Sequence, residues 1–208
     1  FSGLTISNYR TPKAVVAQVP GLTLSGGEDG RSVLTDPSAH SIPMLRSDFS
    51  VPEGKRVRSA RLYITARGIY DCAINGQAVT DTCLNPGHTQ YDRHLLYQTY
   101  DVTALLRPGA NGIGITLASG WWADSQTFQT QNYNYYGDRE AVLARLEVRY
   151  EDGTTDTRVT NAEDWQYYGE GPYVYSGLFQ GEHFDARRRW IYDEYSLPGF
   201  TIDGLKRP

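Results

Sequence analysis

The residues best suited to bind a ligand lie between Trp121 and Arg139, where aromatic and polar side chains are mixed. A pyranose sugar offers a C–H face that packs on an aromatic ring, and hydroxyl groups that hydrogen-bond to carboxylates, amides or guanidinium groups. Both kinds of side chain occur in this stretch, namely Trp121, Trp122, Asp124, Tyr133, Tyr135, Tyr136, Asp138 and Arg139. We therefore predict a shallow sugar-binding site here. The alternative is that Trp121 closes the end of the domain and the tyrosines pack against a partner domain, since amphipathic aromatics also favour interfaces.

A second group of charged residues lies near the C-terminus, where Glu182, Asp185 and Arg187 follow one another closely. Arginine–carboxylate pairs commonly fix the orientation of neighbouring domains, because the planar guanidinium binds a carboxylate through two hydrogen bonds. These three residues are predicted to mark a domain junction. The alternative is that they help to line the catalytic pocket of a neighbouring domain.

Catalysis by this chain itself is not favoured. Inverting hydrolysis of a glycosidic bond needs two carboxyl groups about 6.5–9.5 Å apart across a cleft. The carboxylates near predicted turns and strand ends are Asp81, Asp92, Asp101, Asp124, Asp138, Glu182 and Asp185. Asp and Glu are ordinary occupants of such places, and no Gly-x-Ser-x-Gly nucleophile motif occurs. We assign no catalytic residue.

Metal and cysteine chemistry have little support in the sequence. With four His and two Cys, the chain has no CxxC or HExxH motif, which argues against zinc. No cofactor is required. Calcium is possible at Asp-containing turns or at the Glu28-Asp29-Gly30 loop, because loop carboxylates and carbonyls suit hard cations. Cys72 and Cys83 are two free thiols, or form a disulfide if a bulge shifts the strand register.

Composition excludes several classes of protein. The net charge is −4, and the only basic run is Arg187 to Arg189, too small a footprint for nucleic acid. No apolar run approaches the ~18 residues that a membrane span needs. The first residues lack a signal-peptide pattern, although a processed or excised fragment remains an option. A secreted or periplasmic location is favoured over a cytoplasmic one.

Short strands and turn signals dominate the pattern. Residues 57–66 place Ala60, Leu62, Ile64 and Ala66 on one face, the period of a half-buried strand. Asn75-Gly76 predicts a type I′ hairpin, and residues 140–150 predict a strand that ends at a tight turn. Met44 and Phe49 are expected to face inward. We predict an all-β antiparallel sandwich with a jelly-roll topology.

Three segments are expected along the 208 residues. Residues 1–40 form an N-terminal segment or an edge of the sandwich, and residues 41–187 form the sandwich itself. Residues 188–208 are interpreted as an exit segment, or linker, towards a following domain.

Residues 41–187 resemble the N-terminal β-sandwich domain of bacterial α-L-rhamnosidases, a jelly-roll domain of the galactose-binding type. The motifs that carry the resemblance are PMLRSDFSV, SARLYITARGIYDCAINGQAV, LNPGHTQYD, YQTYDVTALLRPGANGIG, the Gly-Trp-Trp corner and GEHFDAR. Where the family has Gly-Trp-Tyr-x-Gly, this chain has Gly120-Trp121-Trp122-Ala123-Asp124, which leaves the shape of that loop open.

The resemblance implies that hydrolysis belongs to a separate helical barrel that this chain lacks. The chain is then expected to be a non-catalytic accessory domain of an α-L-rhamnosidase, for substrate recognition or for architecture. Its partners would be a rhamnose-containing glycan and the helical catalytic barrel. The alternatives are an autonomous carbohydrate-binding module for rhamnose or a related sugar, and a small complete glycan-active enzyme.

Overall fold

The computed structural model describes residues 42–124, 134–179 and 181–207, and three strands of the preceding segment. The chain divides into two compact units, Phe1–Ser41 and Ile42–Pro208. In the first unit, β1 (Leu4–Thr5), β3 (Ser32–Thr35) and β2 (Thr23–Gly26) pair in that order as an antiparallel sheet. The Glu28-Asp29-Gly30 loop, considered for calcium, lies outside the described residues.

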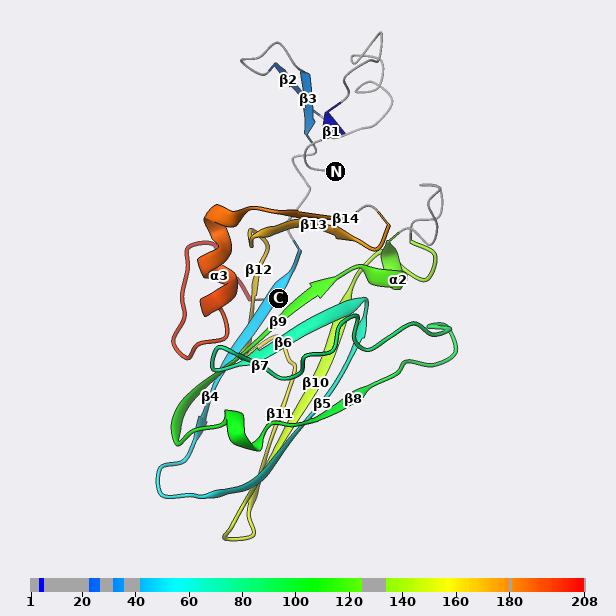
Figure 1. Ribbon diagram of the computed structural model, residues 1–208. Helices are drawn as coiled ribbons and strands as arrows, with labels where there is room; N and C mark the ends of the chain where they lie inside the picture. Colours follow the sequence, from blue (N-terminus) through cyan, green and yellow to red (C-terminus); the bar gives the residue numbers. More distant parts are fainter. Residues whose placement is uncertain are drawn as a thin grey trace. The chain divides into compact units, whose positions relative to one another are not determined.

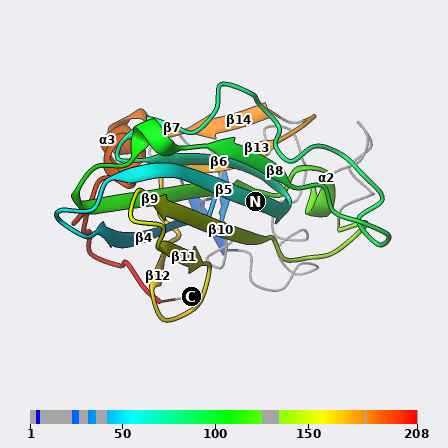
Figure 2. The ribbon, with the colours of Figure 1, turned by 90° about the horizontal axis from the view of Figure 1, so that it is seen from below.

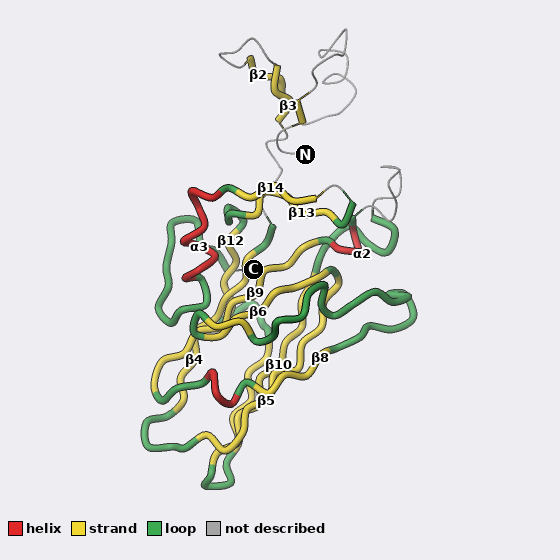
Figure 3. The backbone as a smooth tube through the Cα atoms, viewed as in Figure 1, coloured by secondary structure: helices red, strands yellow, loops and turns green. Residues whose placement is uncertain are grey.

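The second unit consists mainly of two antiparallel sheets (Figure 1, Figure 2). The five-stranded sheet has the order β12 (Trp165–Tyr168), β4 (Met44–Val51), β9 (Gly109–Ala118), β6 (Ile69–Ile74) and β7 (Gln77–Ala78). The four-stranded sheet has the order β11 (Thr155–Val159), β10 (Ala141–Tyr150), β5 (Val57–Arg67) and β8 (Gln98–Asp101). Helical turns are short, namely η1 (Thr103–Leu105), α2 (Gly120–Ala123), η2 (Ala186–Arg188) and α3 (Arg189–Glu194), as Figure 3 shows. The predicted all-β antiparallel sandwich is confirmed.

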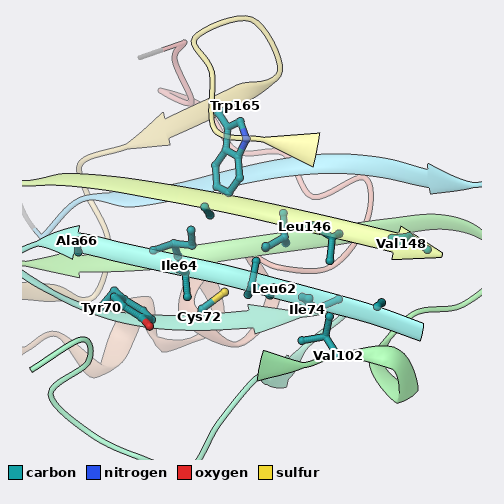
Figure 4. Close-up of a cluster of buried hydrophobic side chains, with 14 of the residues drawn as sticks. Leu62, Ile64, Ala66, Tyr70, Cys72, Ile74, Val102, Leu146, Val148 and Trp165 are labelled. Carbon is teal, nitrogen blue, oxygen red and sulfur yellow. The ribbon is translucent and has the colours of Figure 1, made fainter. Parts of the chain in front are cut away.

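The main core lies between the two sheets and follows the predicted periodicity. On β5, Ala60, Leu62, Ile64 and Ala66 are all buried, and Leu146 lies beside Leu62 on the neighbouring strand β10 (Figure 4). Tyr70, Cys72 and Ile74 face the same core from β6. Each fully buried Leu or Ile side chain contributes about 1.5–3 kcal/mol to the free energy of folding. This layer therefore supplies most of the driving force that holds the sheets together.

The tight turns that the sequence indicated are present. Asn75 and Gly76 have φ angles of 53° and 80°, the left-handed pair that a type I′ hairpin requires. At the end of β8, the Asp101 carboxylate accepts hydrogen bonds from the backbone N and the hydroxyl of Thr103, which stops the strand. The strand itself is short, because only Gln98–Asp101 pairs with β5.

The C-terminal residues build a second core on the outer face of the five-stranded sheet. They follow the hairpin of β13 (Tyr173–Gly177) and β14 (Gly181–Phe184). Ile191 and Tyr195 are buried there against Met44 and Tyr168. The prediction that Met44 faces inward with Phe49 was wrong, because residues five apart on a strand point to opposite faces. Phe49 packs on the main core, whereas Met44 points outward beneath α3.

Arg46 and two glycines hold this segment on the sheet. The buried Arg46 guanidinium donates to the carbonyls of Tyr195 and Leu197, both at 3.0 Å. A Cβ on Gly114 would lie 2.3 Å from the Tyr195 ring, and one on Gly112 would lie 2.5 Å from the Ser196 carbonyl. The residues interpreted as an exit segment therefore run back over the sandwich. A domain beyond them remains a prediction.

Candidate functional site

Aromatic side chains gather at one end of the sandwich, around α2. We call Tyr91, Trp121, Trp122, Ala123 and Tyr136 the end cluster. The rings of Tyr91 and Trp122 meet edge to face with centroids 5.6 Å apart, and Tyr136 lies 5.0 Å from Tyr91. Trp122 is only 8% exposed, and its indole N–H donates to the Arg139 carbonyl at 2.9 Å. Trp122 is thus the packed centre of the cluster rather than an open surface.

Local backbone features position the Trp122 indole. Gly120 has a φ of 50°, and a Cβ there would lie 2.7 Å from the Ile69 side chain. Gly137 crosses the indole so closely that a Cβ would lie 2.3 Å from the ring. The guanidinium of Arg67, which lies at the end of β5, is 5.0 Å from the centroid of the Trp122 ring and makes a cation–π contact with it. Strand, helix and loop therefore all fix this one side chain.

Asp124 is buried and engaged within the chain. It is 3% exposed, and its carboxylate accepts from the Leu178 backbone N at 3.0 Å and from the Tyr175 hydroxyl at 3.4 Å. These contacts tie the end of α2 to the β13–β14 hairpin. Both oxygens already accept hydrogen bonds, so the contribution of Asp124 is to hold two loops together.

The exposed part of this region is a rim around the cluster. Tyr135 is 69% exposed and lies 4.8 Å from Tyr136, while Asp138 and Arg139 are also exposed. On the other side, the ring of His88 lies 5.5 Å from Trp121, which is half-buried. We call Tyr135, Asp138, Arg139 and His88, together with the half-buried Trp121 at the border of the end cluster, the end rim. Tyr133 lies outside the described residues.

Sequence reasoning did not include His88 and Tyr91 in the site. Both come from the connection between β7 and β8, about thirty residues before Trp121, and no periodicity links the two segments. The ring contacts of Tyr91 with Trp122 and Tyr136 appear only once the strands are folded. The one signal in the sequence that could have pointed to them is the pair of aromatic rings in the loop run Gly87-His88-Thr89-Gln90-Tyr91.

The charged group near the C-terminus is largely self-contained. Asp185 caps η2 by accepting from the Arg187 backbone N at 3.1 Å, and its carboxylate takes two bonds from the Arg187 guanidinium, at 2.9 and 2.8 Å. These bonds lower the pKa of Asp185 to about 2. Glu182 lies apart on β14, exposed, and accepts a bond from Ser176 at 3.4 Å. The Asp185–Arg187 pair fixes a local turn.

Two carboxylates do share one small pocket. Asp71 and Glu182 line a hollow of about 80 Å³ between β6 and the β13–β14 hairpin. Burial raises the pKa of Asp71, a hydrogen bond from Tyr192 opposes the rise, and the negative charge of Glu182 adds to it. Ligand pockets usually begin at about 300 Å³, so this hollow does not accommodate a sugar ring between the two acids.

Metal ligands and thiols add no further site in the described part of the chain. Among those residues, no three His, Cys, Asp or Glu side chains converge as a metal site would require. Calcium therefore remains an untested prediction. Both cysteines are free thiols: Cys72 is buried, which raises its pKa, and Cys83 is exposed. No helix in the described ranges is long and apolar enough to cross a membrane.

Comparison with known proteins gives consistent matches. The family described as α-L-rhamnosidase N-terminal domain matches residues 55–206. An α-L-rhamnosidase of Streptomyces avermitilis is 42% identical over 164 residues, which is 79% of this chain but 15% of that protein. One from Formosa agariphila is 35% identical over 161 residues, or 76% of this chain and 17% of that protein.

Solved structures of α-L-rhamnosidases contain the same fold as this chain. The α-L-rhamnosidase of Streptomyces avermitilis complexed with L-rhamnose superposes with a TM-score of 0.74 at 32% identity, covering 97% of this chain and 20% of that one. The α-L-rhamnosidase of Aspergillus terreus gives a TM-score of 0.73 at 31% identity, covering 89% and 24%.

Fold and comparisons together define this molecule as a β-sandwich domain of glycoside hydrolases. More narrowly, the chain belongs to the family of α-L-rhamnosidase N-terminal domains. It spans 15% and 17% of the length of the two curated relatives just described.

Proposed function

We propose that this chain is the non-catalytic accessory domain of a longer α-L-rhamnosidase and contributes to the recognition of rhamnose-containing glycans. The observation that carries the proposal is the match itself, which covers over three quarters of this chain but under a fifth of its relatives. Within the described residues, two hollows are each lined by a pair of carboxylates: Asp71 with Glu182 in about 80 Å³, and Asp48 with Asp164 in about 60 Å³. Both are too small for a substrate. Hydrolysis is therefore assigned to the remainder of the parent protein, with a helical catalytic barrel as the proposed partner.

The end rim is the proposed contact surface for sugar. Tyr135 is exposed beside the charged Asp138 and Arg139, so an aromatic face and hydrogen-bonding groups are available together. The buried end cluster beneath keeps the rim in place through ring contacts and the Trp122 hydrogen bond. Such a shallow, preorganised surface suits one sugar unit of a longer glycan.

Calorimetric titration of the chain with L-rhamnose and rhamnosyl disaccharides tests this function. Tyr135→Ala should abolish the binding heat that arises at the end rim, because it removes the exposed ring proposed to pack on the sugar. Tyr97→Ala is the matched control, since Tyr97 is similarly exposed, at 66% against 69%, on a different loop. Equal heats for the two variants would contradict a site on the end rim. Trp122→Ala is unsuitable as a probe, because Trp122 supports the whole cluster.

A second candidate function is architectural, and exposed apolar side chains favour it. Leu143 is 60% exposed on β10, beside Thr65 of β5, and Tyr97 is 66% exposed next to β8. Thr65 donates to the Leu96 carbonyl, which places this loop at the edge of the same outer face. Apolar surface of this kind is typical of domain interfaces.

Calorimetry on the parent enzyme distinguishes the two roles. If this face is a domain contact, the double variant Tyr97→Ser with Leu143→Ser should show two unfolding transitions, one for the sandwich and one for the rest of the protein. An unchanged single transition in the double variant would contradict the architectural role. Sugar binding at the end rim should be unaffected by both substitutions.

A further inference from the structure

A second hollow opens between the two sheets, beside the start of β10. It has a volume of about 390 Å³, within the usual range for small-molecule pockets. We call it the inter-sheet pocket. Its apolar wall comes from Leu45, Leu117, Val142 and Trp165, and its polar groups include Glu140 and Tyr167.

Hydrogen bonds hold the connection between β11 and β12 in place at the mouth of this pocket. The Asn161 side chain accepts from the backbone N atoms of Glu163 and Asp164 and donates to the Val159 carbonyl, so it is occupied by its own turn. The Thr160 hydroxyl accepts from the Ala144 backbone N at 3.3 Å. The turn is therefore rigidly tied to β10. A pocket held open in this way requires little reorganisation to accept a ligand.

The polar groups indicate the chemistry of the occupant. Glu140 accepts a hydrogen bond from Ser119 through one oxygen, which leaves the other oxygen able to bind a donor. The pKa of the Tyr167 hydroxyl is raised, mainly by burial and secondly by the negative charge of Glu140. The two groups are therefore close enough to interact. An anion would be repelled by Glu140. A purely apolar side chain would bury the carboxylate without replacing the hydrogen bonds that it makes to water.

We propose that the inter-sheet pocket binds one neutral pyranose ring, with a C–H face towards Trp165 and hydroxyl groups towards Glu140 and Tyr167. The inference rests on the proposed role in sugar recognition but uses different residues from the end rim. The apolar wall also favours a ring that carries a methyl group where common hexoses carry a hydroxymethyl group. Burying that methyl is worth a factor of roughly four in affinity.

Titration of the whole 208-residue chain with L-rhamnose, followed by ¹H–¹⁵N NMR, tests the proposal. We expect saturable shifts of the Trp165 indole N–H and of the amides at the start of β10. L-mannose, which is L-rhamnose with a hydroxymethyl in place of the methyl, should bind roughly tenfold more weakly, because its extra hydroxyl would be buried against the apolar wall. Tyr167→Phe should weaken binding by about tenfold, because it removes a hydroxyl group. Glu140→Gln should weaken it by a similar factor, because it replaces one charged acceptor oxygen with an amide donor.

A steric block provides the sharper comparison. Ala162 lines the pocket, whereas Glu163, the next residue on the same exposed turn, does not. Ala162→Trp should abolish the shifts, and Glu163→Trp should leave them intact at an unchanged melting temperature. If both variants behave alike, the proposal is overturned.

The outcomes separate this inference from the proposed function. If Tyr135→Ala removes all sugar binding while Tyr167→Phe and Ala162→Trp do not, the end rim is the only site and the inter-sheet pocket is refuted. If binding survives Tyr135→Ala but not Ala162→Trp, the pocket is upheld. Absence of saturable binding of any sugar refutes both sites and leaves the architectural role.

Discussion

At the scale of single residues, Asn111 shows how strongly one buried amide can organise loops. It is fully buried, and its carbonyl oxygen accepts from the Arg107 backbone N and the Asn75 side chain. Its amide group donates to the carbonyls of Arg107 and Gly109. The hairpin at Asn75 and the turn before β9 are thus joined through one side chain.

Asn111→Ala should lower the free energy of unfolding by about 3 kcal/mol, because buried donors on Arg107 and Asn75 would lose a partner. Urea denaturation measures the change. Gln77→Ala, at an exposed position on the adjoining strand β7, should change it by less than about 0.5 kcal/mol. Similar losses for both variants would contradict the special role of Asn111.

The ionisation of Asp71 and of Asp185 should change the free energy of unfolding in opposite directions as the pH rises. The pKa of Asp71 is raised in the folded chain because its carboxyl group is partly desolvated in the small hollow, although the residue as a whole is exposed. Its protonated form is therefore favoured there, and stability is lost as pH rises through the folded pKa. The pKa of Asp185 is lowered to about 2 by Arg187, so its contribution is present above the ordinary pKa and is lost as pH falls towards 2.

Asp71→Asn should therefore stabilise the chain at pH 7, with the gain shrinking as pH falls through the raised pKa and vanishing by about pH 4. Asp185→Asn should destabilise it at pH 7, with the loss shrinking as pH approaches 2. Unfolding curves of both variants and the wild type across pH 2.5–7 provide the measurement. A shift of the same sign in both variants at pH 7 would contradict the assigned environments.

At the scale of elements, the core strands were predictable because burial on one face imposes a period of two. The alternation of Ala60, Leu62 and Ile64 and the Asn75-Gly76 turn were sufficient to place β5 and the β6–β7 hairpin. The second core was not predictable, because β4 contacts apolar groups on both faces. A strand buried on both sides loses its clean alternation.

The end cluster illustrates the same limit at the candidate site. The sequence grouped Trp121, Trp122 and Asp124 with the later tyrosines as possible sugar contacts, but it could not tell a packed indole from an exposed one. Burial of Trp122 and Asp124 depends on the Arg67, Gly137 and Leu178 contacts, which join segments far apart in the chain. Exposure is a property of tertiary packing, so the rim could be defined only in the folded chain.

The C-terminal segment should respond sharply to one methyl group on β9. Gly114→Ala would place a Cβ 2.3 Å from the Tyr195 ring, so the ring must move and the segment must loosen. Overpacking of this kind costs about 1–3 kcal/mol, and hydrogen exchange at the Leu197 amide, which donates to the Glu194 carbonyl, should accelerate.

A double-mutant cycle provides the control. Tyr195→Ala removes the ring with which the new methyl collides, so Gly114→Ala should cost much less in that background. Additive costs would show that the strain at Gly114 arises elsewhere.

At the scale of the whole molecule, the isolated chain should not release the aglycone from an aryl α-L-rhamnoside, whereas a longer protein that carries the proposed catalytic barrel should. The reason is that, among the described residues, the two carboxylate pairs that line a common hollow, Asp71 with Glu182 and Asp48 with Asp164, enclose only about 80 and 60 Å³. A sensitive chromogenic assay with purified chain measures this. Turnover that disappears in Asp71→Asn or Glu182→Gln would establish the alternative of a small complete enzyme.

The bridge between Lys206 and Tyr167 brings the last described residues beside the first strand of the sandwich. Lys206 pairs with Tyr167 of β12, and Tyr167 in turn pairs with Leu45 near the start of β4. Two strand spacings amount to about 10 Å, so the backbone at Lys206 and at Leu45 lies close together at this edge of the five-stranded sheet. A loosening of β12 would therefore release the start of the sandwich and its C-terminal segment together.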